Sequence, residues 1–373
     1  MDMRKRLRAV CGALVPGLLL ALLFCCPAAA MTGVREGLRL WADAVLPALL
    51  PFFVVTSLLH SCGALAALTP LLRPVCRLLR LPDGLGGLLL ASWISGAPNG
   101  ARLLEPHLQD GSVTPAQAAR FVSAATVTSP LFLIGTVGAY LGSPALGALL
   151  YGIHLLCAIC NGALWRGLGG RETARSDAAF RMDARVSPLL ALPGALRSAC
   201  LLVLFVGAAI AFFSALTAAL EALGLADALG RVLRFALPSD AVQPLLEGFF
   251  EISRGAAQTA QAALPLPLRL SMLCGLSAFG GLSVLCQAQV FLGGRVSFAA
   301  YFAQRVTHAA LSFAVMRGFC LLLGGVLPAF SPVESAVLML PQQAYSLPIL
   351  AACAVFSMVP WGRFLREKRA QGR

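Results

Sequence analysis

Long apolar runs dominate this chain, and each is close to the length that crosses a lipid bilayer as a helix, about 20 residues. The runs lie at residues 9–30, 38–60, 117–140, 144–165, 196–222, 267–293, 298–327 and 344–361. Residues 201–219 are apolar on every face rather than on alternate residues, which favours helices over a membrane β-barrel. Backbone groups in lipid must also be hydrogen-bonded internally. The sequence therefore predicts an all-α polytopic membrane protein with about eight transmembrane helices.

Composition agrees with an embedded chain. Of the 373 residues, 58% are hydrophobic and 12% are charged, whereas a soluble domain carries roughly 25% charged residues. The formal net charge is +13, but the basic residues stand at span ends and in connecting loops. This placement is a topology signal rather than a nucleic-acid surface. The expected partner is the lipid bilayer, and we expect no nucleic acid.

The distribution of basic residues predicts orientation. Arginine and lysine are enriched on the cytoplasmic side of membrane proteins. Three segments are rich in them: the N-terminus, the linker at 166–197 and the tail at 363–373. Four predicted spans separate the first segment from the second, and four separate the second from the third. The even counts allow all three segments to be cytoplasmic, so we expect a cell-membrane protein with both termini in the cytoplasm.

Residues 1–34 form a candidate signal-anchor helix. A basic start is followed by an apolar run from residue 10 to residue 26 and then by Pro-Ala-Ala-Ala. This pattern is also that of a cleaved signal peptide. We favour retention, because the first helix of a multispanning protein can serve as an uncleaved start signal, although cleavage within residues 1–30 stays open.

Two further apolar segments are too short or too interrupted to cross the membrane. One covers residues 84–95 and runs into Gly96, Pro98 and Gly100, and the other covers 242–252 and ends near Gly255. Irregular backbone survives at membrane depth only when it is buried in protein or lines a cavity. The sequence therefore predicts two re-entrant or broken helices in addition to the spans.

The order of spans and breaks occurs twice. We assign a first repeat to residues 35–165 and a second to 196–327, joined by a cytoplasmic linker at 166–195 and followed by a C-terminal helix and basic tail at 328–373. His154 and His308 occupy matching spans. Each unit holds three full spans, an odd number, so the second copy would be inverted relative to the first. Inverted repeats with discontinuous helices are a recurring transporter design.

Several segments carry a resemblance to a known family. They read Ser-Gly-Ala-Pro-Asn-Gly-Ala at 95–101, Thr-Ser-Pro-Leu-Phe-Leu-Ile-Gly at 128–135, Gly-Phe-Phe-Glu-Ile-Ser-Arg-Gly at 248–255, and Phe-Gly-Gly-Leu-Ser-Val at 279–284 with Gln287 beyond. With these segments the chain resembles the YlbJ-type sporulation integral membrane proteins, which carry a nucleoside-recognition (Gate) domain. Ala97 stands where that family usually has an aromatic residue. The resemblance implies a part in endospore formation.

Glu251 leads the candidate site residues, because an ionisable group at membrane depth is costly and usually functional. Glu247 lies four residues earlier, so the two carboxylates would share a helix face and line one wall of a cavity. With Ser253 they would bind a cation, a proton or a polar solute. Alternatively, Glu251 pairs with Arg254 and only holds the shape of the break.

Asn99 is the matching candidate in the first half. The flanking glycines permit tight bends and Pro98 removes an N–H, so carbonyl groups are freed near Asn99. Equivalent breaks are predicted in the next spans, at Ser129 with Pro130 and at Gly280 with Gly281. Four breaks at similar depth predict one binding site between the halves.

Three further polar residues complete the candidate set. His154 and His308 are potential proton carriers or helix-to-helix hydrogen-bond partners, and Gln287 is a potential polar contact or packing residue. Arg305, one turn before His308, requires a carboxylate or carbonyl partner at that depth. No enzyme motif, phosphate-binding loop, metal-binding pattern or cofactor signature is present. Two hypotheses follow: a transporter-like permease for an unknown small polar solute or ion, or a non-transporting scaffold that assembles with membrane-protein partners during spore envelope formation.

Overall fold

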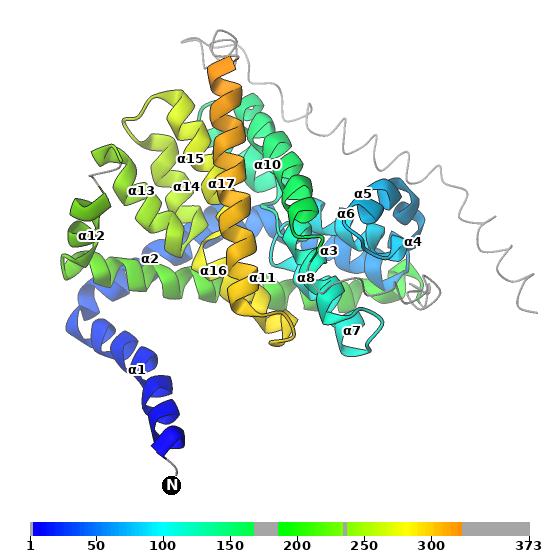
Figure 1. Ribbon diagram of the computed structural model, residues 1–373, viewed down its shortest axis with the longest axis horizontal. Helices are drawn as coiled ribbons and strands as arrows, with labels where there is room; N and C mark the ends of the chain where they lie inside the picture. Colours follow the sequence, from blue (N-terminus) through cyan, green and yellow to red (C-terminus); the bar gives the residue numbers. More distant parts are fainter. Residues whose placement is uncertain (1–2, 168–185, 234–236, 323–373) are drawn as a thin grey trace, which may run out of the picture. The chain divides into compact units, whose positions relative to one another are not determined.

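The computed structural model describes residues 3–167, 186–233 and 237–322, and within these ranges every regular element is a helix (Figure 1). The predicted span at 344–361 and the segment 328–373 lie outside the described residues, as does most of the linker at 166–195. The expectation of an all-helical chain is confirmed for the described part.

The first half runs from the N-terminus to residue 164. Its elements are, in order, α1 (Met3–Cys25), α2 (Pro27–Leu40), η1 (Trp41–Val45), α3 (Leu46–Ser61), α4 (Leu65–Leu68), η2 (Thr69–Leu72), α5 (Arg73–Leu78), η3 (Asp83–Leu85), α6 (Gly86–Ser95), α7 (Asn99–Gln109), α8 (Pro115–Ala125), η4 (Leu131–Val137), α9 (Gly138–Tyr140) and α10 (Pro144–Leu164). Proline opens α2, α8 and α10, where its missing N–H costs no helical hydrogen bond.

The second half repeats this order with fewer short connecting helices. Its elements are α11 (Pro188–Ala222), α12 (Leu225–Leu233), α13 (Ser239–Phe250), α14 (Ile252–Gln261), α15 (Leu266–Phe279), α16 (Gly281–Leu292) and α17 (Phe298–Leu322). In the first half a long helical segment is followed by a half-helix pair, whose two arms are α6 and α7, then by a broken span, α8 with η4, and then by the unbroken helix α10. In the second half the half-helix pair has the arms α13 and α14, the broken span is α15 with α16, and the unbroken helix is α17.

Two 35-residue helical segments, Pro27–Ser61 and Pro188–Ala222, pack along each other. Gly33 contacts Ser214, whereas eight residues later the Trp41 indole N–H donates to the Val203 carbonyl at 3.0 Å, so the two segments run antiparallel. A Cβ atom on Gly33 would lie 2.4 Å from the Ser214 carbonyl oxygen. Small residues therefore allow the close backbone approach that is common between membrane helices.

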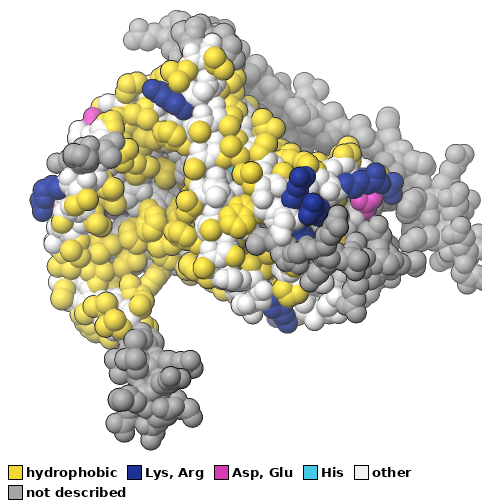
Figure 2. Space-filling view, viewed as in Figure 1, with side chains coloured by type: hydrophobic (Ala, Val, Ile, Leu, Met, Phe, Trp, Pro, Cys, Tyr) yellow, Lys and Arg dark blue, Asp and Glu magenta, His cyan; other side chains and the backbone are white. Residues whose placement is uncertain are grey.

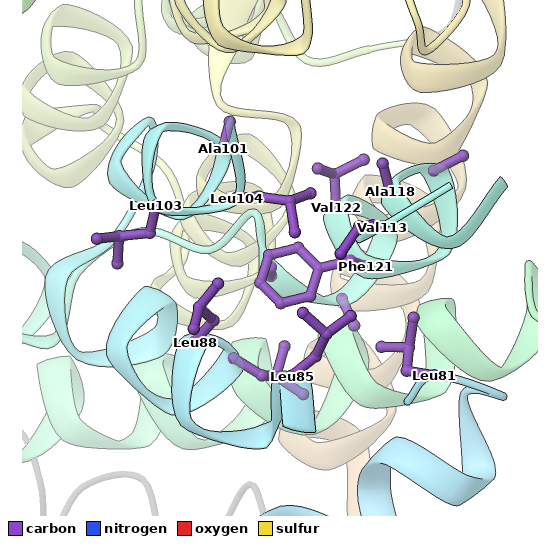
Figure 3. Packing of buried hydrophobic residues seen from close by; sticks show 14 of the residues in the cluster. Leu81, Leu85, Leu88, Ala101, Leu103, Leu104, Val113, Ala118, Phe121 and Val122 are labelled. Atoms are coloured by element: carbon purple, nitrogen blue, oxygen red, sulfur yellow. The ribbon is translucent and has the colours of Figure 1, made fainter. Parts of the chain in front are cut away.

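The half-helix pairs pack across the two halves. The arm α7 contacts α16, and the arm α14 contacts η4 and α9. Behind them, α10 packs against α17. A buried apolar cluster holds the arms of the first pair against α8. Figure 3 shows Phe121 within this cluster, with Leu85, Leu88 and Leu104 directed toward its ring.

The outer surface of the described part suits lipid. Within the described ranges, four helical segments are long and apolar enough to cross a membrane: Pro27–Ser61, Pro144–Leu164, Pro188–Ala222 and Leu266–Leu292. Large apolar side chains are exposed along α11, including Leu201 and Leu204. Figure 2 shows apolar side chains over much of one face of the molecule, with arginine and lysine confined to a few places. Such continuous apolar surface marks contact with a membrane or a partner.

Several predicted spans differ from the observed helices. The run predicted at 9–30 contains a helix end, because α1 stops at Cys25 and Pro27 opens α2. The next helical segment starts at Pro27 rather than at residue 38, so the predicted domain limit at 34/35 falls inside α2. Hydropathy places these limits poorly, since Arg35, Glu36 and Arg39 lower the apolarity of a turn that is nevertheless helical.

Candidate functional site

Four interruptions of helical structure lie next to one another. In the first half they fall between α6 and α7 and between α8 and η4, and in the second half between α13 and α14 and between α15 and α16. Gly96 has a φ of 78°, and a Cβ atom there would lie 2.7 Å from the Ser129 nitrogen, so the first two breaks are in contact. Gly281, with a φ of 77°, approaches the Phe250 carbonyl and Glu251 in the same way. Each half therefore pairs its two breaks through a glycine.

A cavity of about 60 Å³ opens where the four breaks meet. About 10–15 Å³ accommodates one water, so the cavity has room for a few small molecules. Its lining includes residues from all four breaks as well as α3, α11 and α17: Val45, Leu49, Ala97, Thr126, Val127, Thr128, Ser129, Phe132, Val206, Ile210, Glu251, Ile252, Ser253, Ser277, Gly280, Val284, Gln287 and Arg305. The convergence predicted from the sequence is thus present in the structure for Ser129, Glu251, Ser253, Gln287 and Gly280.

Among the described residues that line the cavity, Glu251 is the only one with a carboxylate, and it is 1% exposed. It has extended backbone torsions and precedes the first residue of α14. One carboxylate oxygen accepts the Arg254 backbone N–H at 3.0 Å, and the other accepts the Ser253 hydroxyl at 3.2 Å. Glu251 therefore caps the N-terminus of α14, where the helix dipole favours negative charge.

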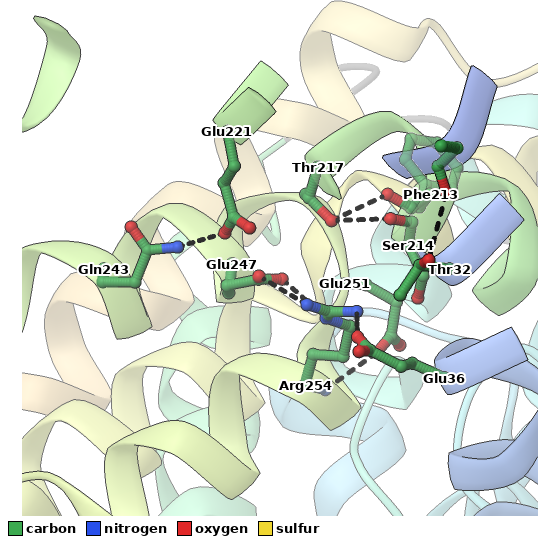
Figure 4. A network of polar contacts seen from close by, with 11 residues as sticks. Thr32, Glu36, Phe213, Ser214, Thr217, Glu221, Gln243, Glu247, Glu251 and Arg254 are labelled. Carbon is green, nitrogen blue, oxygen red and sulfur yellow. Dashed lines mark hydrogen bonds and ion pairs between the residues drawn. The ribbon is translucent and has the colours of Figure 1, made fainter. Parts of the chain in front are cut away.

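Glu247 does not share the cavity wall with Glu251, contrary to the prediction. The prediction assumed a continuous helix, but α13 ends at Phe250, so the four-residue spacing no longer places the two side chains on one face. Glu247 instead forms a two-point ion pair with the Arg254 side chain, at 2.9 Å for each contact. Arg254 also contacts Glu36 at 2.9 Å, and Figure 4 shows this network with Glu251 beside it.

The alternative prediction, that Glu251 pairs with Arg254, is also corrected. The Arg254 guanidinium is directed to Glu247 and Glu36, and only its backbone N–H reaches Glu251. The carboxylate of Glu251 is therefore held in place by a helix end and a hydroxyl, without a guanidinium partner in the described part of the chain.

Asn99 lies outside the cavity lining and is fully bonded within the protein. Its amide nitrogen donates to the hydroxyls of Thr56, at 2.9 Å, and Ser95, at 2.8 Å, and its amide oxygen accepts from Arg102 Nε at 2.8 Å. The Arg102 guanidinium continues to Ser57 and Ser198. Asn99 therefore links the first half-helix pair to the long helices.

The predicted break residues separate into two groups. Gly96, Pro98, Pro130, Gly280 and Gly281 stand at or beside interruptions, whereas Gly100 and Gly255 lie inside α7 and α14. The latter two are needed for packing. A Cβ atom on Gly255 would lie 2.2 Å from the Gly248 Cα atom, and one on Gly100 would lie 2.6 Å from the Ser92 hydroxyl. They let the two arms of each half-helix pair approach closely.

His154 and His308, predicted in matching spans, meet as stacked rings with centroids 4.9 Å apart. His154 Nε2 accepts the Thr128 backbone N–H at 3.0 Å, and His308 Nε2 lies 3.3 Å from the His154 carbonyl oxygen. The pair thus supports the wall of the cavity through Thr128 and does not line it.

Arg305 was expected to need a partner, but it was absent from the candidate site residues. It lines the cavity, is 1% exposed, and donates to the carbonyl oxygens of Thr126 at 2.7 Å and Phe279 at 3.3 Å, and to that of Ala278. These carbonyls stand at the C-terminal ends of α8 and α15, where helices leave acceptors unsatisfied. An arginine in the middle of a mostly apolar run was the available signal for this role.

The apolar helices and the cavity at the meeting point of four helix breaks define an integral membrane protein of the discontinuous-helix type. No family model matches the chain, and no solved structure matches it. The sporulation integral membrane protein YlbJ of Bacillus subtilis (strain 168) is 31% identical to it over 288 residues, covering 71% of this chain and 70% of the relative. The chain belongs to the YlbJ family of sporulation integral membrane proteins. The resemblance seen in the sequence is therefore confirmed.

Proposed function

We propose that the protein is a membrane permease for a small polar solute or ion that acts during endospore formation. The observation that carries this proposal is the cavity at which four helix breaks meet, with Glu251, Ser129 and Gln287 in its wall. Each break forgoes helical hydrogen bonds, and in membranes such irregular backbone occurs where it lines a cavity or pathway. An intramembrane carboxylate in that cavity is a functional site by default. The sporulation role is taken from the relative, which is a sporulation integral membrane protein.

An inverted repeat with eight spans is the architecture we propose for this permease. In each half a 35-residue helical segment precedes the half-helix pair, and the second arm of that pair packs against the broken span of the other half. His154 and His308, from matching helices, stack on each other. Equivalent residues touch in this way when they lie on a two-fold axis. The scheme keeps both termini in the cytoplasm and counts residues 344–361 as the eighth span.

Two arginine contacts suggest how such a permease would alternate. Arg102 ties α7 to α3 and α11, and Arg254 ties α14 to α2 and α13. Because the long helices run antiparallel, Ser57 and Ser198 lie toward one end of the pair and Glu36 toward the other. Release of one contact at a time would open the cavity to one side of the membrane, in keeping with transport through inverted repeats.

The test is reconstitution of the full chain into liposomes and an uptake screen with nucleosides, amino acids, phosphate and inorganic cations. We expect uptake of at least one class by the native protein and its loss in Glu251→Gln, which keeps the size of the side chain and removes the charge. Gln289→Leu is the control, because Gln289 lies on α16 outside the cavity lining.

The second candidate is a scaffold for spore envelope assembly. A chain that folds, shows no uptake in the screen, and supports sporulation equally well with Glu251→Gln would overturn the permease proposal in favour of the scaffold. Loss of sporulation with Glu251→Gln, in a host where the variant accumulates normally, would speak against the scaffold.

A further inference from the structure

Two buried oxygen atoms in the cavity have no hydrogen-bond partner among the described residues. They are the side-chain amide oxygen of Gln287 and the hydroxyl of Ser277, in residues that are 2% and 1% exposed. The Gln287 amide nitrogen donates to the Ser283 hydroxyl at 2.9 Å, which turns its oxygen away from that contact. Buried polar atoms are nearly always bonded, so unbonded oxygens in a cavity are available to a water or an ion. Both line the same small cavity as Glu251.

Of the two charged side chains that line the cavity, Glu251 is the one whose charge is not fully offset by its neighbours. Arg305 is the other lining charge, but its N–H groups are directed to three carbonyls at the ends of α8 and α15. Each helix C-terminus carries roughly half a negative charge, so the two together offset the guanidinium. The single N-terminus that Glu251 caps offsets only about half of its charge.

We propose that Glu251, Gln287 and Ser277 bind one monovalent metal cation, of the size of Na⁺ or Li⁺. The inference deepens the permease proposal, on which it rests, by assigning the cavity to a coupling or transported cation. Hard cations select carboxylate, carbonyl and hydroxyl oxygens, and all three ligand types are present. A divalent cation generally draws on more carboxylate charge than the one available here. The cavity of about 60 Å³ has room for a cation with one or two waters.

The geometry of the neighbouring groups suits this role. Ser253 and the α14 N-terminus fix the Glu251 carboxylate, so its position does not depend on the cation. Ser283 fixes the Gln287 amide in the same way. Because these side chains are already fixed, they lose less conformational entropy on binding a cation than flexible side chains would.

The experiment is thermal unfolding of the purified full chain in detergent, at constant ionic strength, with choline replaced stepwise by Na⁺, Li⁺ or K⁺. We expect a saturable rise in Tm with Na⁺ or Li⁺ and little rise with K⁺. Glu251→Gln and Gln287→Leu should abolish the rise, and Ser277→Ala should weaken apparent Na⁺ affinity several-fold. Ser277→Ala loses no hydroxyl contact within the described residues, so it keeps the test informative if Glu251→Gln does not fold.

Gln287→Glu separates ligation from packing, because a second carboxylate would tighten Na⁺ binding whereas a packing residue would only lose stability. Gln289→Leu, on the same helix and outside the cavity, should leave the Na⁺ response unchanged. A Tm that responds equally to all cations, or only to pH, would overturn the proposal. Na⁺ binding without any uptake would leave this site standing and refute the permease, and uptake without cation dependence would do the reverse.

Discussion

The two half-helix pairs use one backbone design with different electrostatics. In each, an arginine three residues beyond a polar residue of the break ties the second arm to the long helices: Arg102 follows Asn99, and Arg254 follows Glu251. Arg102 donates to an amide and two hydroxyls, all neutral. Arg254 donates to two carboxylates, from Glu36 and Glu247.

This difference separates the roles of the two breaks. In the first pair every bond of the Asn99 amide is made inside the protein, so the break is closed and serves packing. In the second pair the Arg254 guanidinium contacts the carboxylates of Glu36 and Glu247, whereas the carboxylate of Glu251, which accepts only the Arg254 backbone N–H, lines the cavity. Two breaks with similar backbone thus need not share their chemistry: the second break carries a charged side chain that lines the cavity, and the first serves packing.

The largest effect should come from closing the space between the arms. Gly255→Ala places a Cβ atom 2.2 Å from the Gly248 backbone, which cannot move aside, whereas Gly100→Ala meets the Ser92 side chain at 2.6 Å. We expect Gly255→Ala to cost about 3 kcal/mol or more in the free energy of unfolding, and Gly100→Ala less. Unfolding titrations in mixed micelles measure both. Equal losses would contradict the tighter packing of the second pair.

A smaller effect is expected from the two arginines. Arg254→Met leaves the buried Glu247 carboxylate unpaired and should cost about 3 kcal/mol, whereas Arg102→Met leaves only neutral groups and should cost about 1–2 kcal/mol. Pairing Arg254→Met with Glu247→Met removes both charges and should recover most of the loss. The same micelle titration provides the measurement. If the double variant is no more stable than Arg254→Met, the charge on Glu247 is not the cause.

Most of this architecture was predictable from local sequence. Apolar run length predicted the helical class, and glycine and proline predicted the places where helices stop, because these residues act on the backbone within a few positions. Gly280 and Gly281 are examples, since both have left-handed backbone torsions at a break. The meeting of the four breaks was predicted because they occur at similar positions in the two halves of the sequence.

The side-chain partners were not predictable in the same way. The Glu247 prediction failed because one extended residue at position 251 changes which face each neighbour occupies, and the sequence does not reveal where a helix ends to that accuracy. Arg305 depends on carbonyls at the ends of α8 and α15, far away along the chain. Contacts of this kind are set by tertiary packing, which one sequence alone does not specify.

The smallest effect should come from Glu36, the outer partner of Arg254. Its side chain is 53% exposed, and exposed ion pairs contribute about 0–1 kcal/mol, because water and salt screen them. Glu36→Gln should therefore change the free energy of unfolding by less than about 1 kcal/mol, and added salt should reduce even that difference.

Glu247→Gln is the matched variant, since it changes the buried partner of the same arginine by the same atoms. Its cost should be clearly larger and insensitive to salt, because a buried pair is poorly screened. If Glu36→Gln costs as much as Glu247→Gln in a bilayer but not in detergent, lipid covers Glu36. The contact between α14 and α2 would then be as firm as its counterpart at Arg102, and the contrast between the two pairs would lie in Glu251 alone.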